Sequence, residues 1–425
     1  MPIAAVPAYL GTDFKDASPG MRFGMYLKLW GVNRRTHALL WETHDIDYEI
    51  RGQNRQEREV KKENKVGALS DAKSLNRRDK DVMNALATRQ STLAATVPAG
   101  SLLRLDALAI APFTTGLGNE HPLENGFAFL NPYGLPYLPG SGVKGVLRQA
   151  ARELASGEWG EKHGWDALLP SPSGRGAGGE GVFPIDALFG LESKDGDKTH
   201  VRGALTFWDV IPQIKGDSLM VEIMTPHQSH YYQWRKDQRG NPIPVAPHES
   251  GQPTPISFLT VPPGSGFTFH VVCDLAHLNR IAPQLAENDQ WKTLLAAAFE
   301  HAFQWLGFGA KTAVGYGAMA SDAMRRAKEE EMAARREAER QAGEQRKQER
   351  VLANAETWEG ARIKFNRANQ SLTVEKNNKT AIALAPLGAS LLASLPPDMR
   401  RKIETGQFVK VTARVSGNDL LEVGP

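Results

Sequence analysis

The order of elements along the chain predicts an α+β protein with a ferredoxin-like β-sheet and a smaller β-rich segment at its C-terminal end. Alternating apolar side chains over residues 101–111 predict a first strand. Helical apolar patterns follow that strand and return at residues 290–306, with further strands between them. Strand, helix, strands and helix in this order are typical of a sheet with helices on one face.

The first helix belongs to a stretch, Gly116 to Leu154, that also holds several glycines and prolines. Ser141 stands just before the first apolar position, where an N-cap is expected. Three basic residues at four-residue steps form one row on the opposite face. The expected buried positions are Val143, Val146, Leu147, Ala150 and Leu154, and the basic row is Lys144, Arg148 and Arg152.

The remaining core elements are predicted from alternation and turn residues. Strands are expected at residues 203–211 and 220–224. A hairpin is expected between residues 258–261 and 267–273, because Pro262-Pro263-Gly264 is a turn sequence. The second helix should end at Gly307, a residue that favours helix C-termini. Its expected apolar positions are Trp291, Leu294, Leu295, Ala298, Phe299, Ala302 and Trp305.

Composition excludes several classes of protein. The single cysteine, Cys273, rules out an internal disulfide and a cysteine-based zinc cage, and fits a reducing cytoplasm. No apolar run is long enough to span a membrane, and the first residues do not have the pattern of a signal peptide. A net charge of +3 over 425 residues says little about nucleic acid, so the local charge distribution has to be considered.

The segment Pro139 to Gly145 is a glycine-rich loop that opens into a helix. Such a junction presents backbone N–H groups and a positive dipole end, which favour anions, and the basic row beside it favours phosphate. The alternative is an ordinary loop–helix junction with a solvated basic face. No Walker sequence occurs here, and Pro136 and Pro139 interrupt the strand that a dinucleotide-binding fingerprint requires.

A second glycine-rich segment, Gly307 to Gly317, follows the last core helix. Its glycines permit close backbone approach to a ligand. Lys311, Thr312 and Tyr316 supply a cation, a hydroxyl and a stacking face. Taken alone, the segment is better explained as a flexible turn after the last core helix; paired with the first loop, it favours a groove for a nucleic-acid backbone.

Histidines offer little evidence for catalysis. His227 and His230 lie two residues apart without cysteine or carboxylate nearby, so a metal site is not expected there. The neighbouring aromatic residues, Tyr231 among them, fit base stacking or simple packing. His121, between Glu120 and Glu124, could do acid–base work only with a second group brought in by the fold. Asp106, Asp186 and Asp209 flank apolar runs and are expected to cap or pair.

Three motifs carry a resemblance to a known family. The run Leu138 to Arg148 resembles the glycine-rich signature of the RAMP superfamily of CRISPR-associated proteins. The segments Gly116–Gly118 and His121–Gly126 resemble the family of sixth subunits of type III-B Cmr effector complexes. The run Gly307 to Gly317 resembles the C-terminal glycine-rich loop of the superfamily. The likeness covers roughly residues 60–320.

The resemblance implies the ferredoxin-like fold with long insertions, and an RNA-binding subunit without catalysis. Its expected partners are crRNA, target RNA in the assembled complex and other Cmr backbone subunits, with no cofactor, metal or membrane. The alternative is a RAMP endoribonuclease that processes precursor crRNA or cleaves target RNA. The RNA-binding residues we expect are Gly140, Ser141, Gly142, Lys144, Gly145, Arg148, Arg152, His121, His227, Tyr231, Gly307, Gly309, Lys311, Thr312 and Tyr316.

These patterns divide the chain into four regions. Residues 1–100 form an N-terminal arm and a basic helical region, in which residues 79–95 are expected to be a helix. The charged run at 51–80 is either a solvated face or a secondary RNA contact. Residues 101–320 form the ferredoxin-like domain. Residues 321–357 are a charged single helix without a coiled-coil seam, and residues 358–425 are a small β-rich domain, compatible with a partial barrel.

Overall fold

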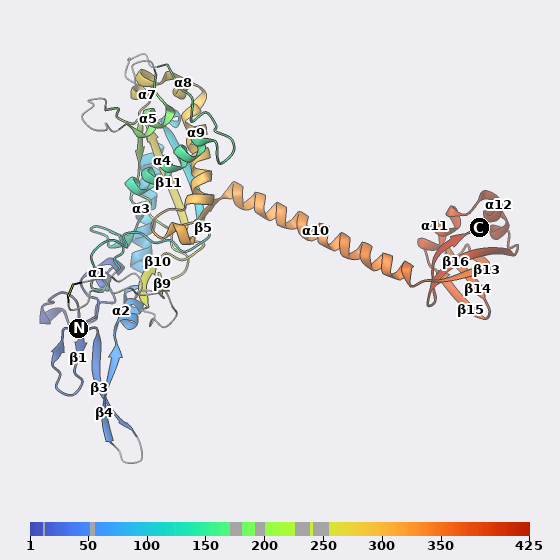
Figure 1. The fold of residues 1–425 in the computed structure, drawn as a ribbon, viewed down its shortest axis with the longest axis horizontal. Coiled ribbons are helices and arrows are strands. Elements are labelled where there is room, and N and C mark those ends of the chain that lie inside the picture. The colour runs from blue at the N-terminus through green and yellow to red at the C-terminus, as the bar shows by residue number, and fades with distance from the viewer. Residues whose placement is uncertain are drawn as a thin grey trace. The chain divides into compact units, whose positions relative to one another are not determined.

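The computed structural model describes residues 1–11, 13–51, 56–123, 125–170, 181–191, 200–225, 239–240 and 255–425. The chain divides into two compact units, Met1–Arg325 (unit 1) and Arg326–Pro425 (unit 2). Figure 1 shows both units with their element labels. Each unit has its own apolar core, so each is described by itself.

The N-terminal part of unit 1 is built from short helices and small hairpins. Its elements are η1 (Ala8–Leu10), α1 (Pro19–Gly24), β1 (Gly31–Val32), β2 (Leu39–Leu40), β3 (His44–Arg51), β4 (Gln56–Glu63), α2 (Lys65–Ala72), α3 (Arg77–Ala95) and η2 (Ala99–Ser101). The charged run at 51–80 is therefore not helical throughout, because β4 pairs antiparallel with β3 over its whole length. A capping box between Asn76 and Asp79 starts α3, whose extent agrees with the sequence pattern.

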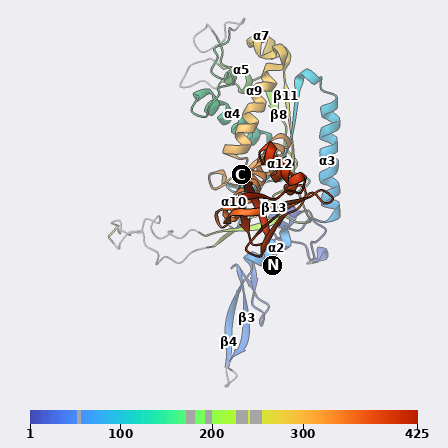
Figure 2. The ribbon, with the colours of Figure 1, turned by 90° about the vertical axis from the view of Figure 1, so that its right-hand side faces the viewer.

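The central sheet of unit 1 has the strand order β12-β5-β11-β8, and each neighbouring pair is antiparallel. Its strands are β5 (Leu102–Ala109), β8 (Leu205–Phe207), β11 (Gly266–Cys273) and β12 (Met319–Ser321). Two helices, α4 (Gly140–Ser156) and α9 (Gln290–His301), occur in the chain order β5-α4-β8-β11-α9-β12. Figure 2 shows α3 beside these strands, running toward the start of β5.

The core lies between the sheet and these helices. Val143, Leu147, Ala150 and Leu154 of α4 are buried, as the helical spacing predicts, whereas Val146 is only half-buried. On the sheet, the Phe269 ring packs edge-on against Phe299 of α9 at 5.1 Å between centroids. Each such ring contributes about 2 kcal/mol through burial alone, so this aromatic contact fixes α9 on the sheet.

The insertions of unit 1 hold the remaining elements. They are β6 (Phe129–Leu130), β7 (Leu135–Pro136), α5 (Pro184–Phe189), β9 (Met220–Met224), β10 (Ile256–Thr260), α7 (Leu275–Ile281), α8 (Pro283–Ala286), η3 (Glu287–Asp289), η4 (Ala302–Leu306) and η5 (Thr312–Val314). The expected hairpin between residues 258–261 and 267–273 is wrong, because β10 pairs with β9 and β11 pairs with β5 and β8.

The second core helix also departs from its predicted pattern at its end. Residues Ala302–Leu306 form a π-helical turn, which shifts the following side chains relative to the α-helical spacing. Trp305 is therefore 57% exposed instead of buried. Its ring packs against Trp159 at 5.4 Å, beyond the end of α4.

Unit 2 contains most of the charged helix α10 (Asp322–Ala353) and a closed barrel. The barrel strands are β13 (Glu356–Asn366), β14 (Ser371–Lys376), β15 (Lys379–Ala383), β16 (Val409–Ser416) and β17 (Asp419–Gly424), with helices α11 (Leu387–Ser394) and α12 (Pro397–Glu404) between β15 and β16. Going round the barrel, the order is β13-β14-β15-β17-β16. Its interior is filled by small and branched side chains such as Ala361, Val374 and Val411.

Candidate nucleic-acid interface

The N-terminus of α4 is built differently from the sequence expectation. The helix begins at Gly140, its N-cap is Pro139, and Ser141 lies within its first turn, so the predicted cap at Ser141 is wrong. Gly140 packs so closely on the backbone of Phe207 that a Cβ atom there would overlap the Phe207 carbonyl. This contact requires glycine and brings the helix start onto β8.

The first backbone N–H groups of α4 are largely occupied. Gly140 N–H donates to the Asp209 carboxylate at 2.7 Å. The N–H groups of Gly142 and Val143 donate to the Pro139 carbonyl at 2.9 and 3.1 Å. Asp209 is thus the anion that compensates the helix dipole, and it disfavours a phosphate at the same place. Ser141 and Gly145, in the first turns of the helix, are exposed.

The basic row on α4 has members of two kinds. Lys144 is half-buried and Arg152 is exposed, and within the described residues neither makes an ion pair or a side-chain hydrogen bond. Arg148 donates from Nη2 to the Gly190 carbonyl at 2.9 Å, just past the end of α5. Arg148 therefore holds α5 to α4, and it is not the freely solvated residue that the spacing alone indicates.

Asp186 of α5 shares this environment. Burial raises the pKa of its carboxyl group, and the positive charges of Arg148 and Arg152 oppose the effect. The Arg148 Nε is buried and finds no acceptor among the described residues. Lys144, Arg148, Arg152 and the exposed Ser141 and Gly145 together are called the α4 surface below.

The glycines of the second loop have positive φ angles and tight packing. Gly307, Gly309 and Gly317 have φ of 70°, 91° and 72°. A Cβ at Gly309 would overlap the Thr114 carbonyl, and one at Gly317 would overlap the Phe308 carbonyl. These glycines therefore serve close backbone packing on residues 112–114, which explains them without a ligand.

The side chains of the same loop point to the β9–β10 hairpin. Lys311 Nζ lies 2.9 Å from the sulfur of Met224 and 5.1 Å from the centre of the Phe258 ring. Tyr316 Oη donates to Glu222 at 3.5 Å, and burial followed by the Glu222 charge raises the pKa of Tyr316. Thr312 starts the short helix η5. The lysine and tyrosine thus line a hairpin surface.

The two glycine-rich segments rest on different parts of the sheet. The start of α4 lies on β8 and Asp209, whereas the second loop lies on residues 110–115 after β5. Within the described residues, no hydrogen bond, ion pair or ring contact joins residues 139–145 to residues 307–317. The two loops therefore do not contact each other directly through these interactions, and the groove expected between them stays a prediction.

His121 is part of the packing near the N-terminus. Its ring stacks on Phe23 at 4.0 Å, Nδ1 accepts from the Leu123 N–H at 3.2 Å, and Nε2 lies 3.1 Å from the Phe23 carbonyl. Since Nδ1 accepts, Nε2 carries the proton and donates. Burial lowers the pKa of His121. Both ring nitrogens are engaged, so His121 is not free for acid–base work.

Two expected contact residues, His227 and Tyr231, lie outside the described residues, as does Glu124 beside His121. Two of the three aspartates named from the sequence have side-chain hydrogen-bond partners, and the third, Asp186, lies near the charges of Arg148 and Arg152. Asp106 accepts from Thr268 at 2.6 Å, and Asp209 caps α4. Among the described residues, no group of three or more histidine, cysteine, aspartate or glutamate side chains could hold a metal ion. No described helix is long and apolar enough to cross a membrane.

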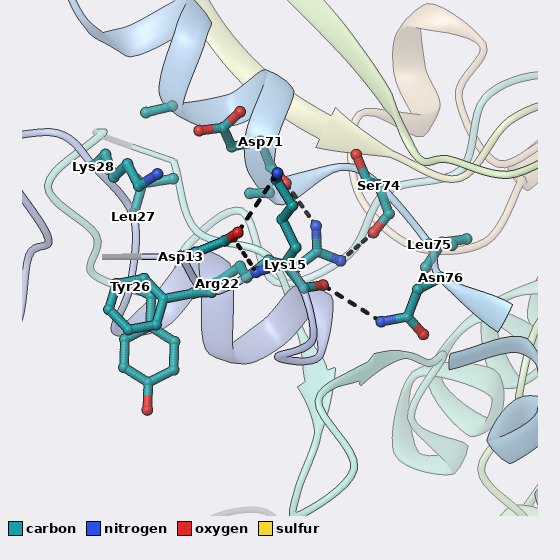
Figure 3. A pocket seen from close by; sticks show the side chains of 13 residues that line it. Asp13, Lys15, Arg22, Tyr26, Leu27, Lys28, Asp71, Ser74, Leu75 and Asn76 are labelled. Atoms are coloured by element: carbon teal, nitrogen blue, oxygen red, sulfur yellow. Dashed lines mark hydrogen bonds and ion pairs between the residues drawn. The ribbon is translucent and has the colours of Figure 1, made fainter. Parts of the chain in front are cut away.

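A pocket of about 370 Å³ lies near the N-terminus and was not predicted from the sequence. Figure 3 shows Arg22 at its wall, with its guanidinium directed at the carbonyls of Asp71 and Ser74. Arg22 is buried and also lies 3.7 Å from the carboxylate of Asp79. A lone arginine between two apolar residues gave no signal in the sequence. Its carbonyl partners show that it joins α1 to the chain around α2.

These features define an antiparallel-sheet domain with a cationic helix surface and a glycine-rich loop packed beside its first strand. The chain belongs to the RAMP superfamily, whose family profile matches residues 107–320. It is 28% identical over 241 residues to the CRISPR system Cmr subunit Cmr6 of Pyrococcus furiosus, a match that covers 48% of this chain. The chain spans 63% of the length of that relative.

Solved structures show partial likeness. A cryo-EM structure of the type III-B Cmr-beta complex bound to cognate target RNA contains a chain with 17% identity and a TM-score of 0.38, covering 60% of this chain and 70% of that one. The crystal structure of Cmr6 from Pyrococcus furiosus has 24% identity and a TM-score of 0.28, covering 52% of this chain and 97% of that one.

Proposed function

We propose that this chain is a crRNA-binding structural subunit of a type III-B Cmr effector complex. It caps the protein backbone near the crRNA 3′ end in antiviral defence. The observation that carries the proposal is the 28% identity to Cmr6, in a chain whose residues 107–320 match the RAMP family. Its partners are then crRNA, target RNA in the assembled complex and the other Cmr backbone subunits, and its place is the cytoplasm.

We infer that the four-stranded sheet is the ferredoxin-like platform of this function. The chain order β5-α4-β8-β11-α9-β12 and the strand order β12-β5-β11-β8 support this reading. Such a platform holds α4 in place through its buried face while the opposite face remains accessible. The platform itself contributes rigidity, and the exposed cations contribute binding.

The α4 surface supplies phosphate contacts through Lys144 and Arg152, which are without ionic partners among the described residues. Lys311 and Tyr316 extend the contact toward the β9–β10 hairpin. Contacts to phosphate give affinity with little sequence preference, which suits a subunit that carries guides of many sequences. Arg148 has a supporting role, because its guanidinium is already bound to Gly190.

The decisive experiment is a titration of crRNA with the double variant Lys144→Glu, Arg152→Glu. Loss of two charge-assisted contacts should weaken binding by about tenfold or more, while thermal stability stays unchanged. A matched variant on α10, Arg346→Glu with Lys347→Glu, changes the net charge equally at two exposed positions and should bind as the parent does. Equal affinities for all three proteins would remove the α4 surface from the site.

Two further measurements test whether the protein binds RNA through phosphates and whether it cleaves RNA. If phosphates dominate, the logarithm of the affinity should fall linearly with the logarithm of salt, with a slope of about 0.7 per phosphate contacted on a single strand. Incubation of the purified protein with labelled precursor crRNA and target RNA, with and without Mg²⁺, should leave both intact. Cleavage of either RNA would replace the structural role by that of a RAMP endoribonuclease.

A further inference from the structure

Unit 2 lies outside the family match and has a topology of its own. Numbered along the chain, its strands follow one another round the barrel as first, second, third, fifth and fourth, with α11 and α12 between the third and the fourth. The third and fifth strands, β15 and β17, run parallel, and the other pairs are antiparallel. This is the arrangement of the OB-fold, a five-stranded Greek-key barrel that in many proteins binds oligonucleotides.

The outer face of this barrel carries a compact set of cations around an exposed aromatic ring. Arg362 of β13 lies directly opposite Lys410 of β16 in the strand register. Phe408 precedes β16 and is 76% exposed, and the Arg362 guanidinium lies 5.6 Å from the centre of its ring. Lys364 is two residues further along β13, on the same outer face. These four residues are called the barrel patch.

The three cations of the barrel patch are balanced only in part, by one carboxylate of the neighbouring strand β14. Glu375 pairs with Lys364 at 3.0 Å. Glu375 also lies opposite Arg362 in the register of β13 and β14, but within the described part of the chain neither Arg362 nor Lys410 forms an ion pair. Like charges placed directly opposite on neighbouring strands are destabilising, so this pair costs stability unless an anion lies between them. The Phe408 ring beside them is mostly exposed, so its burial contributes little to the stability of the barrel.

Phosphate and a nucleobase together would satisfy both features. A bound phosphate would neutralise Arg362 and Lys410, and a base would stack on Phe408, as bases do on the aromatic residues of single-strand-binding proteins. The strands that such barrels use most often, the second and third, have Thr373, Glu375, Thr380 and Ile382 at their outward positions here, and their lysines, Lys376 and Lys379, stand at the turn between them. Because these outward positions include no cation, that face is the weaker candidate.

We propose that the barrel patch of unit 2 binds single-stranded RNA, as a second contact separate from the α4 surface. The ligand chemistry is a ribose–phosphate backbone with at least one unstacked base. Binding there needs no sequence preference, since the contacts are to phosphate and to the face of a base.

The test uses the full chain and a 4-thiouridine oligoribonucleotide of about ten nucleotides, within the roughly 4–16 nucleotides that one OB-fold covers. Because unit 1 is also proposed to bind RNA, the position of the photo-cross-link is the primary readout. The parent protein should cross-link within residues 405–416, which include Phe408. In Phe408→Ala this cross-link should be lost, and affinity should fall about tenfold, which corresponds to about 1.4 kcal/mol.

Charge variants give a second readout. Arg362→Glu with Lys410→Glu should abolish the barrel cross-link. Arg346→Glu with Lys347→Glu on α10 makes the same change in net charge and should leave it intact. The variant Thr380→Glu with Ile382→Glu on the third strand, β15, should also leave it intact.

Three results would overturn the proposal. The first is a cross-link in the parent that avoids residues 405–416. The second is a loss of the cross-link in the Thr380/Ile382 variant alone, which would move the site to the neighbouring face. The third is a barrel cross-link that survives the Arg362/Lys410 change. None of these outcomes alters the Lys144/Arg152 titration, so the barrel patch and the α4 surface fail or succeed independently.

Discussion

At the scale of single residues, the buried guanidinium of Arg22 joins several separate segments of unit 1. It donates to the carbonyls of Ala17, Asp71 and Ser74 and lies near the Asp79 carboxylate. Burial lowers the pKa of Arg22, and burial raises that of Asp79. Both shifts have the direction expected for charges taken out of water, where each needs the other.

Replacing Arg22 by alanine should therefore strip three carbonyls of their donor and leave Asp79 without its counter-charge. We expect unit 1 to lose about 3 kcal/mol of stability, measured by chemical denaturation. Lys28→Ala, at an exposed lysine of the same pocket, is the control and should change stability by less than about 0.5 kcal/mol. Equal effects of the two substitutions would show that Arg22 does not hold α1 in place.

A pH dependence should follow from two histidines. Burial lowers the pKa of both His121 and His270, so the unfolded chain takes up protons first as the pH falls. Stability from these neutral rings is complete above the unfolded pKa of about 6.5 and is lost as the pH drops below it. His121→Gln should reduce the fall in melting temperature between about pH 7.5 and about pH 5.5. A pH profile identical to the parent's would argue against the buried neutral ring.

At the scale of elements, α4 and α5 depend on one another through Arg148. Because Arg148 donates to the Gly190 carbonyl at 2.9 Å, Arg148→Ala should destabilise unit 1 by about 1–2 kcal/mol. Lys144→Ala, on the same face but without such a partner, should leave stability unchanged within about 0.5 kcal/mol. Thermal denaturation of the two variants compares them directly. If both were neutral, α5 would be held by its apolar contacts alone.

Elements with strong periodicity were predictable from sequence. The buried face of α4, the position of β9, the extent of α3 and the long helix α10 all follow from spacing and caps. The pairing of the strands was not predictable from sequence. Pro262-Pro263-Gly264 is a typical hairpin-turn sequence, but the strand before it, β10, pairs with β9 and not with β11. A turn sequence fixes a local bend, whereas the partner of a strand depends on residues far away in the chain.

In the candidate site, too, local sequence predicted the helix but not its long-range partners. Spacing identified the cations of α4 correctly as one row on the helix. Spacing could not show that Arg148 donates to the Gly190 carbonyl or that Asp209 accepts the first N–H of the helix. Nor could it show that Phe23 stacks on His121. Each of these partners lies 42 or more residues away in the chain, so only the folded chain brings them together.

At the scale of the whole molecule, the two units have separate apolar cores. A chain that ends after Arg325 should therefore fold and keep its own cooperative unfolding transition. The cut has to follow Arg325 and not Ala320, because Met324 packs on the core of unit 1. Scanning calorimetry should show the truncated chain's transition again within the profile of the full chain. Aggregation of the truncated chain would mean that unit 2 completes the core of unit 1.

The closure of the barrel in unit 2 is uneven around its circumference. β13 and β16 share six register pairs, whereas β15 and β17 share one, Ile382 with Asp419. The Ile382 N–H donates to the Asn418 carbonyl at 2.8 Å at this seam. We expect the Ile382 amide to exchange its hydrogen faster than those in the middle of β13, as measured by amide exchange.

When the pairing of β15 with β17 opens, the barrel becomes a curved sheet with two exposed edge strands. Edge strands present unpaired N–H and C=O groups, which can pair with a strand of another chain. At high protein concentration, the partner closest at hand is the seam of another copy. Storage and refolding of this protein should therefore produce dimers by strand exchange through unit 2, and a staple across β15 and β17 should suppress them.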